Sequence, residues 1–267
     1  MNLTRTFAVI LRQWYLFRSS PVRVVPLFAW VTVDMVLWGY LARYLDRMAV
    51  PGQQLVPALL GAVLLFDFFS RVMQGVTTAF FEDVWACNFL NYFASPLRIS
   101  EYLAGLVITG VLTSAVGLAV MLGLATAVFG LSFAVYGALL VPFILILVVF
   151  GLALGIVGCA LVLRLGPASE WFIWPIPSLM APLAAVFYPL STLPVPLQWI
   201  GRALPLSCVF EGMRAVLHGG AVSGAALAWG SGLTVLYLAL ASWWFARVYD
   251  RAVKSGLIAR YSAESVG

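Results

Sequence analysis

Six long apolar stretches, separated by shorter and more polar segments, take up most of this chain. A hydrocarbon core about 30 Å thick needs roughly 20 helical residues to cross it. Inside lipid such stretches must be helices, because only a helix satisfies its own backbone hydrogen-bonding groups. The pattern predicts an all-α integral membrane protein, one transmembrane domain over residues 1–267. Its predicted spans are 24–41, 55–77, 103–129, 136–163, 172–190 and 225–246.

The residues before the first span have a different pattern. Apolar side chains recur there at helical spacing, while Arg5 and Arg12 lie on another face. This predicts an amphipathic helix over residues 1–20 that lies on the cytoplasmic membrane surface and ends at Ser20-Pro21. The apolar positions are Leu3, Phe7, Ile10, Leu11, Trp14 and Phe17.

Residues 81–103, between the second and third predicted spans, combine acidic and aromatic side chains. Glu82 and Asp83 would suit the first turn of a helix, where the helix dipole favours negative charge. We therefore expect a short amphipathic helix over residues 82–93, which Ser95-Pro96 ends. Large aromatic side chains are costly to leave in water, which favours a docking surface over an ordinary connecting loop. Its candidate contact residues are Glu82, Asp83, Trp85, Asn88, Phe89 and Leu90.

Residues 189–220, between the last two spans, are too apolar for an outer loop and too rich in proline for a straight span. Two short helices, 196–204 and 206–217, fit the proline start signals. We expect the pair, residues 196–217, to dip into the membrane from outside without crossing it. The candidate residues of this outer segment are Pro194, Pro205, Glu211 and Arg214, and the last two can pair at a spacing of three.

Three ionisable residues lie near the middle of predicted spans. Asp34 belongs to the first span, whereas Asp67 and Arg71 belong to the second. Such groups cost several kcal/mol in lipid unless they are paired or hydrated, so they face a protein interior or a cavity. Asp67 and Arg71 are four residues apart and can meet on one helix face. Both a structural ion pair and a pathway lining remain open, and Asp34 joins them if the first two spans pack together.

Composition and charge exclude other classes of protein. Hydrophobic residues make up 63% of the chain, charged residues only 9%, and the mean hydropathy is +1.03. Soluble domains carry about 25% charged residues. The net charge of +5 is not clustered into a basic face, so no nucleic-acid partner is expected. Ten Lys and Arg residues fall on one side of the predicted spans and four on the other, which predicts a cell (inner or plasma) membrane protein with both termini cytoplasmic.

Catalytic and metal-binding motifs are missing from the sequence. The only lysine is Lys254, so no phosphate-binding loop of the form GxxxxGK[ST] can be written. Cys87, Cys159 and Cys208 are scattered and have no metal-ligand spacing. We predict no catalytic residue, cofactor or metal site. A powered transporter built from this chain would therefore depend on a partner for its energy.

The order of these elements resembles the type-2 ABC exporter permease family over nearly the whole chain. The most specific similarity is Leu193-Pro194 through Ala203-Leu204-Pro205-Leu206 to Glu211-Gly212-Met213-Arg214. The second is Glu82-Asp83 through Ser95-Pro96-Leu97-Arg98, which is similar to the coupling helix of that family. A Gly-Thr pair often found before the serine is missing, and Ala104-Gly105 is not followed by lysine. These departures leave the substrate subfamily unassigned.

The resemblance implies partners as well as a fold. It implies a second permease copy, identical or related, two separate ABC ATPase subunits that hold ATP and Mg, and surrounding membrane lipid. It also implies export of an amphiphile, which can be a drug, a lipid or a lipid-linked glycan, and the lack of an added carbohydrate-binding region points toward a drug-like or lipid-like cargo. Two alternatives stay open: an intramembrane enzyme that uses Asp34 and Asp67, and a membrane scaffold or assembly factor. A stoichiometric nucleotide-binding partner would favour the exporter.

Overall fold

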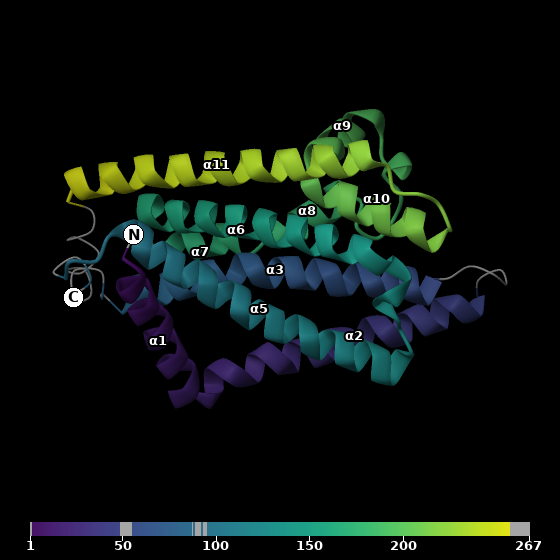
Figure 1. Ribbon diagram of the computed structural model, residues 1–267, viewed down its shortest axis with the longest axis horizontal. Helices are drawn as coiled ribbons and strands as arrows, with labels where there is room; N and C mark the ends of the chain where they lie inside the picture. Colours follow the sequence, from purple (N-terminus) through teal and green to yellow (C-terminus); the bar gives the residue numbers. More distant parts are fainter. Residues whose placement is uncertain (1, 49–54, 87, 89–91, 93–94, 257–267) are drawn as a thin grey trace.

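The computed structural model describes residues 2–48, 55–86, 88, 92 and 95–256, and these form helices without a strand (Figure 1). The prediction of an all-α chain is confirmed for this part. Three 3-10 turns accompany the α-helices: η1 (Phe133–Leu139), η2 (Pro167–Ser169) and η3 (Leu190–Thr192). The α-helices are α1 (Leu3–Ser19), α2 (Pro21–Met48), α3 (Leu55–Trp85), α5 (Ile99–Phe129), α6 (Leu140–Leu165), α7 (Glu170–Ile173), α8 (Ile176–Leu183), α9 (Val195–Ala203), α10 (Pro205–Leu217) and α11 (Gly224–Lys254).

Four helical segments of the described residues are long and apolar enough to cross a membrane: Val56–Trp85, Ile99–Phe129, Phe133–Leu165 and Gly224–Lys254. They contain the predicted second, third, fourth and sixth spans. The predicted first span, 24–41, lies inside α2, which is not among the four. Its 28 residues nevertheless give a helix about 42 Å long, enough to cross a bilayer.

The predicted fifth span, 172–190, is wrong as a single helix. This stretch contains α7 and α8, which are separated by a turn at Trp174 and Pro175, and the chain leaves helical geometry after Leu183. Proline lacks the N–H that continues the helix ladder and clashes with the preceding turn. Pro182 lies in the last turn of α8, and Ala185 then takes a left-handed conformation with φ 52°. The apolar stretch is therefore two short helices and a sharp turn.

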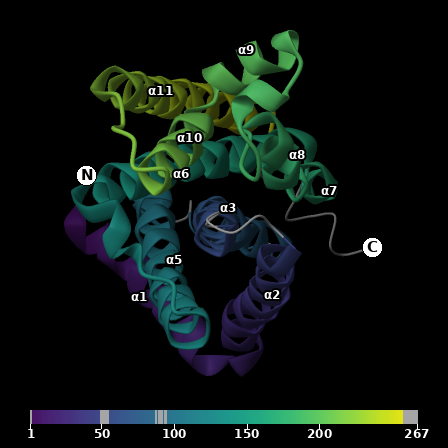
Figure 2. The same cartoon turned by 90° about the vertical axis from the view of Figure 1, so that its right-hand side faces the viewer.

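α6 is the central helix of the bundle, and it packs between α3 and α11 (Figure 2). Small residues make this close packing possible. A Cβ atom at Gly151 would lie 3.0 Å from the Cβ of Val72, and one at Gly155 would lie 3.0 Å from the carbonyl oxygen of Met73. Small residues let helix backbones approach closely in lipid, where packing drives helix association. On the opposite side of α3, α5 and α2 complete the bundle.

α1 and α2 form a V, and α1 packs against α5 (Figure 1). The buried side chains of α1 are Thr6, Val9 and Gln13, and Val9 lies against Gly105 of α5. The apolar positions found from the sequence point outward instead, with Leu3, Phe7, Leu11 and Trp14 all exposed. The helix thus presents a polar face to the protein and an apolar face to its surroundings.

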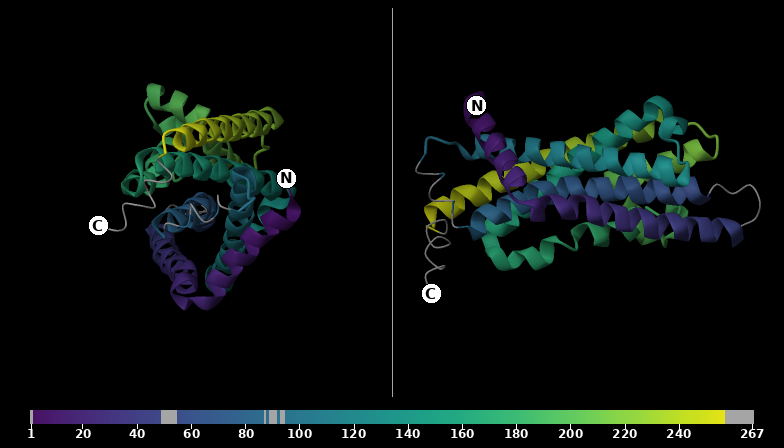
Figure 3. Two further views of the ribbon diagram at one scale, coloured as in Figure 1. Left: turned by 90° about the vertical axis from the view of Figure 1, so that its left-hand side faces the viewer. Right: turned by 90° about the horizontal axis from the view of Figure 1, so that it is seen from below.

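The molecule has two ends, and they carry different elements. α1, the last turns of α3, the start of α5 and the last turns of α11 lie at one end, which we call the α1 end (Figure 3). α9 and α10 lie at the other, which we call the α9 end. α3 continues to Trp85 instead of ending near residue 77, so the predicted helix over residues 82–93 begins inside α3.

Candidate functional site

A cavity of about 560 Å³ lies between α1, α2, α3, α5 and α7. Cavities of this size typically hold small-molecule ligands. Its lining mixes charged, polar and aromatic side chains in a bundle that is otherwise apolar. The polar and aromatic lining residues are Gln13, Phe17, Trp30, Asp34, Asp67, Arg71, Gln74, Thr78, Glu82, Thr109, Thr113, Ser114 and Trp174.

Asp67 and Arg71 form the ion pair that their spacing on α3 allows. The Arg71 Nε atom donates to Asp67 Oδ2 over 2.7 Å, and both side chains are largely buried. A charge-assisted hydrogen bond of this length offsets part of the cost of holding both charges away from water. The pair borders the cavity, so it lies beside any molecule that enters.

Asp34 of α2 lines the same cavity, because α2 and α3 pack side by side. Its side chain is half-buried. Among the residues that the structure describes, none donates a hydrogen bond to this carboxylate and no cation lies within ion-pair distance of it. The carboxylate of Asp34 therefore differs from that of Asp67, which Arg71 neutralises.

α3 and α5 form the wall of the cavity opposite α2, and their backbones approach each other closely there. A Cβ atom at Gly75 would lie 3.1 Å from the Cα atom of Gly110. The hydroxyls of Thr109 and Thr113 donate to carbonyl oxygens of their own helix, over 2.9 Å and 3.0 Å. Because these hydroxyls keep free lone pairs, the α5 wall can accept hydrogen bonds from a guest molecule.

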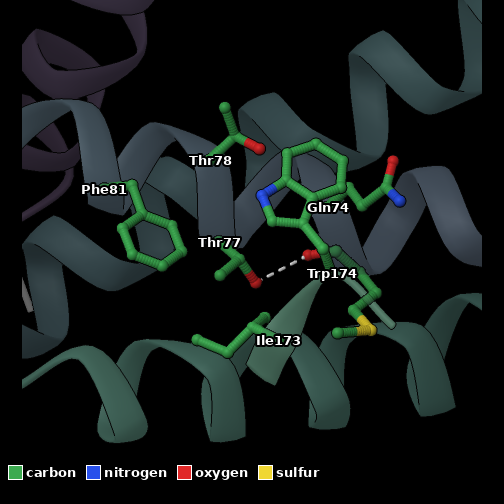
Figure 4. Close-up of a pocket in the computed structure, with 7 residues that line it drawn as sticks. Gln74, Thr77, Thr78, Phe81, Ile173 and Trp174 are labelled. Carbon is green, nitrogen blue, oxygen red and sulfur yellow. Dashed lines mark hydrogen bonds between the residues drawn. The ribbon is translucent and has the colours of Figure 1, made fainter. Parts of the chain in front are cut away.

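A smaller cavity, about 10 Å³ and large enough for one water molecule, adjoins the large one at α7 (Figure 4). Gln74, Thr78 and Trp174 border both cavities. The Thr77 hydroxyl, which lines the small cavity, donates to the carbonyl oxygen of Met73 over 3.0 Å. Trp174 is positioned by its own indole N–H, which donates to Glu170 over 2.9 Å.

Asp83 lies one residue beyond the cavity-lining Glu82 and is 1% exposed. Two Arg12 nitrogens donate to its oxygens over 2.6 Å and 3.2 Å, and the Tyr102 and Tyr92 hydroxyls donate over 2.6 Å and 3.3 Å. The Arg12 guanidinium also lies 5.2 Å from the centre of the Tyr92 ring. We call these four residues the Asp83 cluster. It joins α1, α3, α5 and the segment after α3.

The position of Asp83 corrects the sequence prediction. It was expected at the start of a surface helix, where the helix dipole favours acidic residues, but it lies near the end of α3, where the dipole opposes them. Four donors from three other parts of the chain compensate for this. Burial and the neighbouring Asp83 charge raise the pKa of Tyr92, which keeps its hydroxyl protonated as a donor.

Glu101 is a second acidic residue that fixes α1 at this end of the molecule. It accepts hydrogen bonds from the backbone nitrogens of Asn2 and Arg98, over 2.6 Å and 3.1 Å. Arg5 lies 3.6 Å from its carboxylate and also donates to the carbonyl oxygen of Pro96. Glu101 and Arg5 thus hold the start of α1 against both α5 and the segment that precedes it.

Trp85 and Asn88, two further candidate docking residues, lie just beyond Asp83 in the chain. Trp85 is the last residue of α3 and is 62% exposed. Asn88 follows in a turn, and its backbone nitrogen donates to the carbonyl oxygen of Asp83 over 3.1 Å. Phe89 and Leu90 lie outside the described residues. An exposed tryptophan therefore stands directly beside a buried polar cluster.

At the α9 end, the candidate residues form a separate arrangement. The Arg214 Nη2 atom donates to Glu211 Oε1 over 2.8 Å, and the same oxygen accepts from the Leu190 backbone nitrogen over 2.7 Å. Arg214 also donates to the carbonyl oxygens of Ala185 and Val186. Pro194 and Pro205 precede and open α9 and α10, respectively. The Glu211–Arg214 pair thus ties α10 to the turn after α8, and these residues do not line the cavity.

Comparison of the sequence with known protein families identifies the family of the chain. The family model of the ABC-2 type transporter matches residues 1–218. The chain belongs to the ABC-2 type transporter family. No curated protein matches it. As an ABC-2 type protein it is the multi-pass membrane permease of an ABC exporter, a transport subunit of a kind that normally pairs with an ABC ATPase.

In this ABC-2 type permease the geometry does not favour the alternative of an aspartate enzyme. In an aspartate dyad of the aspartic-protease kind, two adjacent carboxyl groups share one proton. Asp67 instead accepts a hydrogen bond from Arg71.

Sequence reasoning found the charges of the cavity and missed other residues of the site. The structure brings Asp34, Asp67, Arg71 and Glu82 to one cavity. Sequence reasoning missed Gln13, Arg12 and Glu101 as residues of the site. They are polar residues on helices that were predicted from the spacing of apolar residues. One signal was present in the sequence: Arg12 and Gln13 lie outside the apolar stripe of α1, Arg12 opposite it and Gln13 at its side. Charged and amide residues on that face mark it as the side that contacts protein.

Proposed function

We propose that this permease exports an amphiphilic molecule, drug-like or lipid-like, through the cavity between α1, α2, α3, α5 and α7. The observation that carries the proposal is the lining of that cavity. Aromatic side chains suit the apolar part of an amphiphile, while carboxylates, amides and hydroxyls suit its polar part. A cavity that served only as a packing defect in lipid would be lined by apolar residues.

We further propose that the α1 end faces the cytoplasm and receives the ATPase. The chain has no phosphate-binding loop, so energy must enter through a protein contact. The segment from Glu82 to residue 93 is the proposed contact, with Trp85, Asn88, Phe89 and Leu90 seated on the ATPase. Two ATPase subunits would hold ATP and Mg, and a second permease copy, identical or related, would complete the assembly in a cell membrane.

The Asp83 cluster supplies a physical route from that contact to the cavity. Glu82 lines the cavity directly before Asp83, and Gln13 lines it directly after Arg12. A displacement of the segment that contains Trp85 would therefore move Asp83 and Arg12. The displacement would reach the cavity, because Glu82 and Gln13 are their neighbours in the chain. Packed, hydrogen-bonded elements transmit such displacements because they change between discrete arrangements.

The coupling proposal is tested by changing the aromatic anchors. Trp85→Ala combined with Phe89→Ala should release the ATPase, or uncouple it, because buried aromatic anchors contribute about 2 kcal/mol or more each to protein contacts. Glu82→Ala should do less, with an effect that shrinks at high salt. The measurement is the amount of ATPase retained on the purified permease, together with hydrolysis stimulated by substrate.

A matched control is Trp199→Ala, which removes an exposed tryptophan from α9 at the other end of the molecule. It should keep wild-type ATPase retention. If the double aromatic variant also keeps wild-type retention and stimulated hydrolysis, this segment is not the coupling element. A wild-type permease that never retains an ATPase would remove the exporter proposal altogether.

A further inference from the structure

The ionisable side chains that line the cavity differ in their partners. Three carboxylates line it (Asp34, Asp67 and Glu82), against one guanidinium, that of Arg71. Arg71 is already engaged by Asp67. Among the described residues, the Asp34 carboxylate therefore stands without a hydrogen-bond or ion-pair partner. An unpaired carboxylate in a membrane-embedded cavity is costly, and a bound cation would remove that cost.

We infer that the cavity binds an amphiphilic organic cation, an inference that rests on the proposed export function and names its substrate class. The positive group would lie against Asp34. The apolar body would lie against the rings of Phe17, Trp30 and Trp174, whose faces also attract cations. Trp30 and Trp174 are both exposed although they line the cavity, so aromatic rings stand at its opening.

The same lining disfavours the other charge classes. An organic anion would meet the unpaired carboxylate of Asp34, and it would have to compete with Asp67 for Arg71. A divalent metal ion needs several oxygen ligands in one place. No group of three candidate ligands among His, Cys, Asp and Glu exists in the described part of the chain. A single unpaired carboxylate in a cavity that aromatic rings also line suits an ion whose charge is spread over a large apolar body.

A buried amide indicates a second feature of the ligand. Gln13 is 2% exposed and lines the cavity, and within the described residues its Nε2 atom has no hydrogen-bond partner. Leaving a buried donor without a partner typically costs 1–3 kcal/mol. A ligand oxygen, from an ether, ester or amide, would satisfy it. The inferred ligand therefore carries a cationic group for Asp34 and an oxygen acceptor for Gln13.

The charge assignment is tested with two ions of the same shape. Tetraphenylphosphonium and tetraphenylborate differ in sign but share four phenyl groups. Binding is measured by equilibrium dialysis on the permease–ATPase complex in lipid nanodiscs, with empty nanodiscs subtracted. The cation should bind at least tenfold more tightly than the anion, and Asp34→Asn should weaken cation binding about tenfold or more. Asp34→Glu keeps the charge and should keep the preference for the cation.

Asp46→Asn is the matched control, because Asp46 is an exposed carboxylate of the same helix and does not line the cavity. It should leave both affinities unchanged. Equal binding of the two ions, binding of neither ion, or a full cation affinity in Asp34→Asn would each overturn the inference. None of these outcomes affects the export proposal, which depends on the retention of the ATPase.

The oxygen acceptor is tested separately. Rhodamine 6G is an organic cation that carries an ester, whereas tetraphenylphosphonium has no oxygen. Gln13→Leu should fold normally, because it removes a buried donor that has no partner among the described residues. It should weaken rhodamine 6G binding severalfold and leave tetraphenylphosphonium binding unchanged. An equal loss for both cations, or no loss for either, would contradict the role given to Gln13.

Discussion

The exposure of Asp67 and Arg71 determines how much their ion pair should contribute to the stability of the fold. Exposed pairs contribute about 0–1 kcal/mol, whereas breaking a fully buried pair costs about 3–5 kcal/mol. Their side chains are 21% and 13% exposed and border a cavity. We therefore expect Asp67→Ala to destabilise the folded permease by an intermediate amount, about 2 kcal/mol. Thermal unfolding in detergent and the folded yield measure this.

The double variant Asp67→Leu with Arg71→Leu should recover much of that loss, because both charges leave together. Exposed Asp46→Ala serves as the control and should change neither yield nor unfolding. A double variant that folds but does not transport would place the pair in the pathway. Single variants with unchanged yield, unfolding and transport would show that both groups already reach water.

At the residue scale, local pairs were predictable and distant ones were not. The Asp67–Arg71 contact follows from helix geometry alone, because residues four apart share a face. Asp83 carried a misleading local signal, since its partner Arg12 lies 71 positions earlier in the chain. Gln13 was not predicted to be buried, because the buried face of a helix is usually recognised by its apolar residues.

At the scale of elements, prolines correctly predicted the starts of α9 and α10. In the predicted fifth span, prolines were given too little weight. α9 and α10 begin within one residue of the predicted positions, because proline suits the first turn of a helix. The predicted fifth span contains Pro175, Pro177, Pro182 and Pro189, but its length and apolar composition were given more weight. The same reasoning about proline, applied there, would have divided it into α7 and α8.

Glu211 and Arg214 tie α10 to the segment after α8, and these bonds lead to a prediction about gating. Arg214 supplies the hydrogen bonds to Ala185, Val186 and Glu211. Arg214→Ala should loosen α10 by about 1–3 kcal/mol, since three acceptors lose a charged donor. We expect altered export or leak, and altered basal ATPase activity, while the complex stays assembled.

The control is Arg202→Ala, which removes an exposed arginine from α9 that stacks on Trp199. It should leave export and basal hydrolysis unchanged. Both rates are measured on assembled permease–ATPase complex in the same vesicles. Rates in the Arg214 variant that equal the wild-type values would argue against a gating role for the α9 end.

At the scale of the whole molecule, the two ends differ in chemistry as well as in structure. The α1 end contains the Asp83 cluster, Glu101 and exposed Trp85, while the α9 end contains a proline-rich helix pair tied by Glu211 and Arg214. The cavity lies between helices that start or end at the α1 end, and its lining includes Gln13 and Glu82 from that end. This asymmetry suits a route that is entered from one side and closed on the other.

The last prediction concerns the orientation of the two ends in the membrane. Because ten of the fifteen Lys and Arg residues fall on the predicted side of the termini, the positive-inside rule predicts that the α1 end faces the cytoplasm. Single cysteines at Ser223 and Gln53 should react with a membrane-impermeant maleimide added to intact cells. Cysteines at Asn88 and Ser265 should react only after the cells are opened. The background must first lose Cys87, Cys159 and Cys208, since half-buried Cys208 of α10 would itself report from the α9 end. Labelling of Ser265→Cys in intact cells would overturn the orientation or the number of crossings. It would also place the Asp83 cluster outside, where no ATPase could reach the segment beside it.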